Sequence, residues 1–210
     1  MKHTLYILLL SCLSLTSLKA NTPMREWFIT MPDSIMPLLT KNNRLDFIDF
    51  IDSRMDAVVT NRLDGKSHMT QLTDDYLHIQ YTKVNDITMK LLPVTDTTHV
   101  LCMVTTMNTS VRDSRIAFFA EGWKPVSTIT HFAEPQKSCF ITVEQNDSTR
   151  HTLQKLDIHF KTYTLSPKDN TLTCRLTTLD YLNNSDREAV KPHIREKLIY
   201  RWDGMKFVTE

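Results

Sequence analysis

The sequence predicts an α+β fold, in which an N-terminal helical segment packs on an antiparallel β-sheet. Apolar residues recur at helical spacing before residue 60, and from residue 77 onward they alternate with polar residues, as in half-buried strands. The alternating runs are short and are separated by turn-forming residues, which is typical of antiparallel hairpins. The 210 residues include three glycines, too scattered for the glycine-rich phosphate loops of doubly wound nucleotide-binding folds.

Two helices are expected in the N-terminal part, after an apolar lead-in at residues 23–31. The first should begin at Pro32-Asp33-Ser34, because short polar side chains cap free backbone N–H groups. The second should follow residue 43, where apolar residues at helical spacing share one face. They are Phe47, Ile51, Met55 and Val58. Residues 61–65 end this helix, because Gly65 can adopt a left-handed conformation.

Short strands occupy most of the remaining chain. The run at residues 100–104 is apolar at every position and is therefore expected to be buried on both faces. Residues 133–155 predict an irregular connection with room for a short helix, and residues 186–190 a short helical piece. Turns are expected at residues 166–170 and 203–204. The expected strands lie at residues 77–81, 87–91, 100–104, 116–120, 126–130, 156–160, 172–176, 198–202 and 206–208.

The domain organisation has two candidate forms. The length of residues 21–210 suits a single globular unit with a sizeable core. A weak internal similarity at an offset of 56 residues, between 105–116 and 161–172, gives the alternative of two tandem similar lobes at 21–132 and 133–210. Because any two hairpins look alike at this level, the single unit is preferred.

The first 20 residues match a secretory signal peptide. A basic head at Lys2 precedes an apolar run, and Ala20 offers a small residue for cleavage. The run is too short and too interrupted by Ser and Thr to span a bilayer. Cys12 follows a faint lipoprotein-like pattern, which keeps acylation there as a minority alternative. We therefore expect an exported protein of the periplasm or outer cell surface.

The charge pattern argues against several classes of partner. Removing residues 1–20 takes away Lys2 and Lys19 and leaves 23 basic against 24 acidic residues, with the two signs interspersed. Such a chain has no long-range attraction for nucleic acid or anionic lipid. No second apolar stretch is long enough for a membrane span, so no nucleic acid and no membrane span are expected.

No catalytic, metal or cofactor motif stands out in the sequence. Cys102 and Cys174 lie in apolar alternating runs and are expected to be buried and inert, while the pairing of these two and Cys139 stays open. The histidines lack the spacing of a zinc site. Catalytic and metal-binding residues and cofactors are therefore expected to be none, and the ligand-binding residues remain unknown.

Acidic and aromatic side chains are weighed as candidates for binding. The aspartates of the second helix suit a solvated face better than a calcium loop, and Asp74-Asp75 suits a turn. Trp123 lies at a turn, where an indole can stack on a sugar or peptide, and its role stays open. Trp202, beside the last hairpin, is expected in the core.

Several local segments together resemble an uncharacterised family of exported proteins, a domain-of-unknown-function family of gut-type anaerobic Gram-negative bacteria. These segments are 31–39 (MPDSIMPLL), 44–49 (RLDFID), 61–67 (NRLDGKS), 89–93 (MKLLP) and 200–207 (YRWDGMKF). The resemblance covers nearly all of residues 21–210. It implies a periplasmic or outer-surface location, and it carries over no activity and no functional residue.

Three functional hypotheses follow. The preferred one is a non-catalytic binding or accessory protein of the cell envelope that recognises a protein, peptide or glycan through a sheet face or edge. The alternative is an envelope hydrolase whose site forms only in three dimensions, which would show as a cleft with a hydrogen-bonded acid, base or nucleophile. A structural subunit of a larger assembly is the third.

Overall fold

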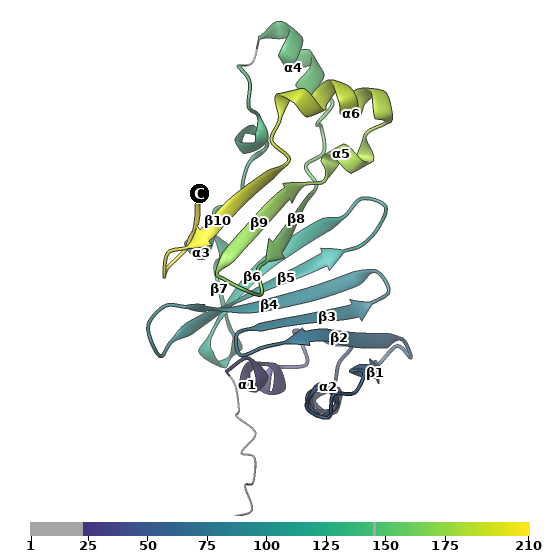
Figure 1. Ribbon diagram of the computed structural model, residues 1–210, viewed down its shortest axis with the longest axis vertical. Helices are drawn as coiled ribbons and strands as arrows, with labels where there is room; N and C mark the ends of the chain where they lie inside the picture. Colours follow the sequence, from purple (N-terminus) through teal and green to yellow (C-terminus); the bar gives the residue numbers. More distant parts are fainter. Residues whose placement is uncertain (1–22, 145) are drawn as a thin grey trace, which may run out of the picture.

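The computed structural model of the protein describes residues 23–144 and 146–210. It contains a seven-stranded and a four-stranded antiparallel sheet with short helical segments, which confirms the predicted α+β class (Figure 1). The predicted signal peptide, with Cys12 and Ala20, lies outside the described residues.

The seven-stranded sheet is a simple meander in which each strand pairs with the next along the chain. Its order is β1-β2-β3-β4-β5-β6-β7, and every pairing is antiparallel. Its hairpin turns therefore fall alternately at the two ends of the strands. The strands are β1 (Val58–Thr60), β2 (Lys66–Leu72), β3 (Tyr76–Thr82), β4 (Asn85–Pro93), β5 (His99–Met107), β6 (Asp113–Ala120) and β7 (Lys124–Val126).

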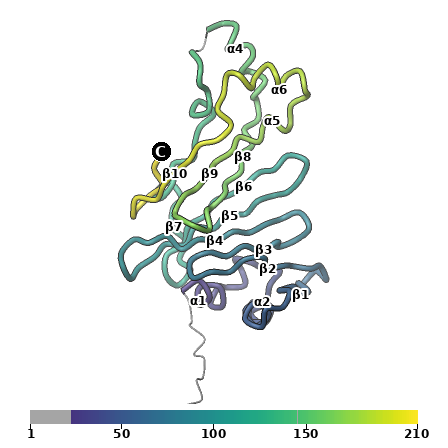
Figure 2. Tube along the Cα trace, in the orientation of Figure 1, coloured from purple at the N-terminus to yellow at the C-terminus, as the bar shows by residue number. Residues whose placement is uncertain are grey.

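The four-stranded sheet is formed by the C-terminal part of the chain, in the order β11-β10-β9-β8. Its strands are β8 (Lys161–Leu165), β9 (Thr171–Leu176), β10 (Lys197–Trp202) and β11 (Phe207–Thr209). β8 packs against β4, β5 and β6 of the larger sheet, and the smaller sheet is seen next to that part of it (Figures 1 and 2).

Helical segments lie at both ends of the molecule. α1 and α2 cover the larger sheet, whereas α4, α5 and α6 gather at the far end, beyond the four-stranded sheet (Figures 1 and 2). The α-helices are α1 (Pro23–Thr30), α2 (Lys41–Asp52), α3 (Thr128–His131), α4 (Asp147–Leu153), α5 (Thr178–Tyr181) and α6 (Asn184–Val190). Three 3-10 turns are η1 (Glu121–Trp123), η2 (Lys137–Phe140) and η3 (Lys191–His193).

The larger sheet is the middle layer of three, with a hydrophobic core on each side. Period-two alternation along β4 sends Met89 and Leu91 to the core beneath α1 and α2, and Leu92 to the core between the sheets. β5 divides in the same way, with Leu101 on the helix side and Cys102 on the sheet side, as predicted for a strand buried on both faces. Residues of both sheets share the second core.

The predicted helix at Pro32–Ser34 is wrong. The helix occupies the preceding apolar lead-in as α1, and residues 33–39 form turns instead. Their backbone makes i→i−3 bonds, from Ile35 to Pro32 and from Leu39 to Met36. Proline at 32 and 37 removes two backbone donors that a longer helix would use.

The end of the second helix also differs from the prediction. α2 ends at Asp52, so Met55 and Val58 do not belong to the predicted apolar helix face. Val58 instead begins β1. Arg54 adopts a left-handed φ of 57°, and the Met55 N–H donates to the Phe50 carbonyl at 2.8 Å, which is a Schellman-type end. Met55 is consequently 59% exposed rather than buried.

Two predicted strands are misplaced, and β2 was not predicted. β7 ends at Val126 and gives way to α3, and the run at 156–160 is not a strand, since β8 begins at Lys161. Around 156–160 the Thr178 hydroxyl supplies backbone partners, accepting from Phe160 N–H and donating to the Ile158 carbonyl. β2 lacks a clear apolar alternation because one of its buried positions is the polar Ser67. The Ser67 hydroxyl donates to the Tyr81 carbonyl at 2.7 Å.

The segment between α1 and α2 is held by a buried arginine. Arg44 is 2% exposed, and its guanidinium donates to the carbonyls of Met31 and Leu39 and to the Asp33 carboxylate. The hydrogen bond from Arg44 holds the pKa of Asp33 below its ordinary value of 3.8.

This ion pair predicts a pH-dependent stability. A carboxylate with a lowered folded-state pKa stabilises the fold above its unfolded pKa, and the stabilisation is lost as pH falls through the folded pKa. Wild type should therefore be more stable than Asp33→Asn at neutral pH, and the difference should shrink below about pH 4. Urea unfolding of both proteins between pH 3 and pH 7 measures this; a difference that is independent of pH would contradict it.

Candidate functional site

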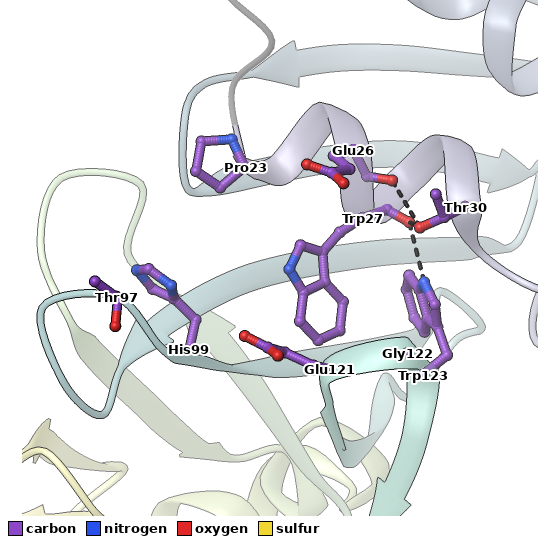
Figure 3. A pocket seen from close by; sticks show the side chains of 9 residues that line it. All are labelled: Pro23, Glu26, Trp27, Thr30, Thr97, His99, Glu121, Gly122 and Trp123. Carbon is purple, nitrogen blue, oxygen red and sulfur yellow. Dashed lines mark hydrogen bonds between the residues drawn. The ribbon is translucent and has the colours of Figure 1, made fainter.

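A cavity of about 450 Å³ lies at one end of the larger sheet. Three segments meet there: α1, the β4–β5 loop at residues 94–98, and the β6–β7 turn at residues 121–123 (Figure 3). Volumes of this size suit a small ligand or a short piece of a larger one. The lining residues are Pro23, Glu26, Trp27, Thr30, Thr97, His99, Glu121, Gly122 and Trp123.

Helix α1 is fixed to the sheet and presents its outer face to the cavity. Met24 and Phe28 are buried in the core, and the Met24 N–H donates to the Asp74 carbonyl at 3.0 Å. Arg25 and Asp52 tie α1 to α2 with an ion pair of 2.7 Å. Because these anchors lie on the buried side, Glu26, Trp27 and Thr30 are left to line the cavity.

Two indole rings form one wall of the cavity. Trp27 and Trp123 are arranged edge to face, with ring centroids 5.4 Å apart, and Phe119 lies 5.4 Å behind Trp123. The Trp123 indole N–H donates to the Trp27 backbone carbonyl at 3.1 Å. Trp123 is therefore a buried support, only 6% exposed, and the more accessible Trp27 is the ring that can meet a ligand.

The turn that carries Trp123 uses two left-handed residues. Gly122 has φ 70° and Trp123 has φ 61°, which turns the chain back from β6 to β7 within three residues. This geometry points the Trp123 ring beneath α1 and leaves Glu121 exposed at the cavity (Figure 3). Trp123, whose role the sequence left open, thus belongs to the cavity, where it is buried and supports Trp27.

The polar lining of the cavity is acidic. Glu26 comes from α1 and Glu121 from the β6–β7 turn, so the two carboxylates reach the cavity from different sides (Figure 3). His99, the first residue of β5, also lines the cavity. Neither lysine nor arginine is among the nine described residues that line it. Within the described chain, no hydrogen bond or ion pair engages the Glu26 or Glu121 carboxylate.

Three of the other acids weighed from sequence have structural partners. Asp75 pairs with the buried Lys90 at 2.8 Å, and Asp56 with His68 at 2.9 Å. The Asp52 carboxylate binds Arg25, as described above. None of these acids lines the cavity.

The cysteines are free thiols. Cys102 and Cys174 are buried, as predicted, and Cys139 is exposed; no disulfide joins the cysteines of the described chain. Burial raises the pKa of Cys102 well above its ordinary value and that of Cys174 to about 12. Both therefore stay protonated at neutral pH.

A second polar cluster, of Glu134, Lys161 and Tyr163, lies at β8. The Glu134 carboxylate accepts from the Tyr163 hydroxyl at 3.1 Å and binds Lys161 at 2.8 Å. Burial raises the pKa of Tyr163 strongly. None of these three residues lines a described cavity, so we assign them to the packing of β8.

No group of three or more His, Cys, Asp or Glu side chains within residues 23–144 and 146–210 is placed to hold a metal ion. Over the same residues, no helix has the length and apolar character needed to cross a bilayer.

Sequence reasoning did not identify the cavity, because its residues come from segments nearly 100 positions apart. Glu26 and Trp27 lie in the apolar stretch at 23–31, whose pattern does not predict a helix, and Glu121 lies in a turn. The one signal in the sequence was Trp123 beside Gly122, a bulky residue at a tight turn.

Comparison with known proteins gives the chain a family without an activity. A solved structure, titled as a domain of an uncharacterized protein from Porphyromonas gingivalis W83, matches with a TM-score of 0.80 and 26% identity. The match covers 90% of this chain and 100% of that one. No curated protein matches. The model of one family, described as protein of unknown function (DUF3256), matches residues 15–207, and the chain therefore belongs to that family.

Proposed function

We propose that the protein is an exported, non-catalytic binding protein of the cell envelope and that the cavity beside Trp27 holds its ligand. The observation that carries the proposal is the construction of this cavity. An accessible indole and uncommitted polar groups are set on a rigid base of buried aromatic rings, which is how ligand sites are usually built.

The proposal of export rests on the sequence of residues 1–20, with cleavage near Ala20. A mature chain that begins at residue 21 keeps every residue that lines the cavity. The envelope ligands open to such a protein are a protein, a peptide or a glycan.

A hydrolase remains the alternative function. It would need an acid, a base or a nucleophile hydrogen-bonded to one another in the cleft. In the described chain no hydrogen bond joins the side chains of Glu26, His99 and Glu121, and this arrangement favours the binding proposal.

The test is an affinity capture from envelope extract with the mature protein, residues 21–210. Wild type, Trp27→Ala and Ile129→Ala serve as baits; Ile129 is 80% exposed on α3 and away from the cavity. Trp27→Ala keeps the backbone carbonyl that Trp123 uses, so the cavity wall should survive. Loss of a central aromatic contact should reduce retention of the ligand at least about tenfold.

The expected result is a partner that wild type and Ile129→Ala retain and Trp27→Ala loses, with bound species identified by mass spectrometry. Equal retention by all three baits would place binding elsewhere. No retained species with a folded wild-type bait would contradict stable binding.

A further inference from the structure

The charge of the Trp27 cavity is one-sided. Two carboxylates, Glu26 and Glu121, line it, and Asp96 lies in the same loop as the lining residue Thr97. The nearest cationic side chains along the chain do not compensate: Arg25 is held by Asp52, and Lys124 is not a lining residue. The cavity therefore attracts positive charge.

The carboxylates are available to a ligand. Each is exposed, and within the described residues neither accepts a side-chain hydrogen bond nor forms an ion pair. Other carboxylates of the described chain are engaged by cations, such as Asp33 by two arginines and Glu134 by Lys161. What distinguishes Glu26 and Glu121 is that they come from two separate elements and line the same cavity (Figure 3).

The indole of Trp27 adds a second attraction for a cation. A ring face binds ammonium or guanidinium groups through its quadrupole, and tryptophan is the strongest of the aromatic residues in this role. The ring is held in place because Trp123 supports it edge-on and bonds its backbone. Holding the ring in advance removes part of the ordering cost of binding.

A neutral ligand fits this chemistry less well. An uncharged sugar can donate hydroxyl hydrogen bonds to the two carboxylates, but it leaves their negative charge unpaired, whereas a cationic ligand neutralises it. The lining offers no Asn, Gln or Arg side chain of the kind that orders sugar hydroxyl groups. At about 450 Å³ the cavity exceeds one side chain and can also take part of the backbone that carries it.

We infer that the cavity recognises a basic side chain, lysine or arginine, presented by a peptide or protein segment. This inference rests on the proposed binding function and specifies its ligand. The Glu26 and Glu121 carboxylates bind the cationic head, and the Trp27 ring covers its aliphatic stem or its charged face.

The test is a titration followed by ¹H–¹⁵N NMR of the mature protein. The probes are acetyl-Lys-Lys-Lys-amide, acetyl-Glu-Glu-Glu-amide and the neutral trisaccharide maltotriose. The three indole N–H signals report directly: Trp27 and Trp123 line the cavity, and Trp202, which donates to the Pro93 carbonyl, is the internal reference. We expect the lysine peptide to shift the Trp27 signal saturably, with little change at Trp202 and no saturable shift from the other two probes.

Two variants separate a specific site from general attraction. Glu26→Gln/Glu121→Gln keeps the shape of the cavity and should weaken binding of the lysine peptide at least about tenfold. Glu188→Gln/Glu196→Gln makes the same change in net charge at two exposed positions outside the cavity and should leave the affinity within about twofold.

Equal weakening by both double variants, or saturation of Trp27 by maltotriose, would overturn the cationic ligand while leaving the binding function intact. The absence of any shift with the lysine peptide would also overturn it. The capture experiment with Trp27→Ala then decides the binding function independently, because it does not depend on the class of ligand.

Discussion

Replacing Phe132 with alanine should lower the free energy of unfolding by about 3–5 kcal/mol. Phe132 is 1% exposed in the core between the sheets. Its ring meets Tyr163, Tyr200 and Phe207 edge to face, with centroids 5.4, 5.1 and 6.1 Å away. The substitution removes a large apolar group and these aromatic contacts, and the strands around it cannot close the space.

Chemical denaturation followed by tryptophan fluorescence and circular dichroism measures this effect. Because residues of both sheets share this core, we expect one cooperative transition in wild type and in the variant. Ile129→Ala, close by in the sequence but exposed, should change stability by less than about 0.5 kcal/mol. Two separate transitions would contradict the single unit at 21–210 and favour the lobes 21–132 and 133–210.

Replacing Arg44 with leucine should cost about 3 kcal/mol. The buried guanidinium satisfies the carbonyls of Met31 and Leu39, which would lose their donors in the substituted protein. An orphaned buried polar group costs about 1–3 kcal/mol, and two carbonyls are affected here. The leucine fills part of the space and recovers part of the loss.

Arg62→Leu is the matched control. Arg62 binds the same Asp33 carboxylate at 2.7 Å, but it is 47% exposed, and exposed pairs contribute at most about 1 kcal/mol. Urea unfolding of both variants at pH 7 makes the comparison. If the two substitutions cost the same, the buried backbone partners of Arg44 are not what stabilises the segment between α1 and α2.

The sequence could predict most strands because their burial follows a simple alternation. β3, β4, β5 and β6 lie where the period-two pattern placed them, and so do β9 and β10. The strand predictions failed where a side-chain hydroxyl forms the hydrogen bonds on which the local structure depends. Ser67 is buried through a hydrogen bond rather than apolar character, and Thr178 supplies partners to a run that looks like a strand.

The first helices show the same limit. The segment between them is held by Arg44, which binds the carbonyls of residues 31 and 39, and α2 ends at the left-handed Arg54. Arg54 occupies the left-handed position that glycine usually takes at such a helix end. The cavity could not be predicted from the sequence, because its lining residues meet only when α1 packs beside the β6–β7 turn.

The most direct test of the central claim, that the Trp27 cavity holds the ligand, is site-specific photocrosslinking. A benzophenone amino acid is placed at Thr30, an exposed lining position, or at Lys168 in the β8–β9 turn, and cells that produce each protein are irradiated. A defined adduct from position 30 that is absent from position 168, and that is lost with Trp27→Ala, is the predicted result. The same adduct from both positions, or adducts from position 168 alone, would contradict the claim.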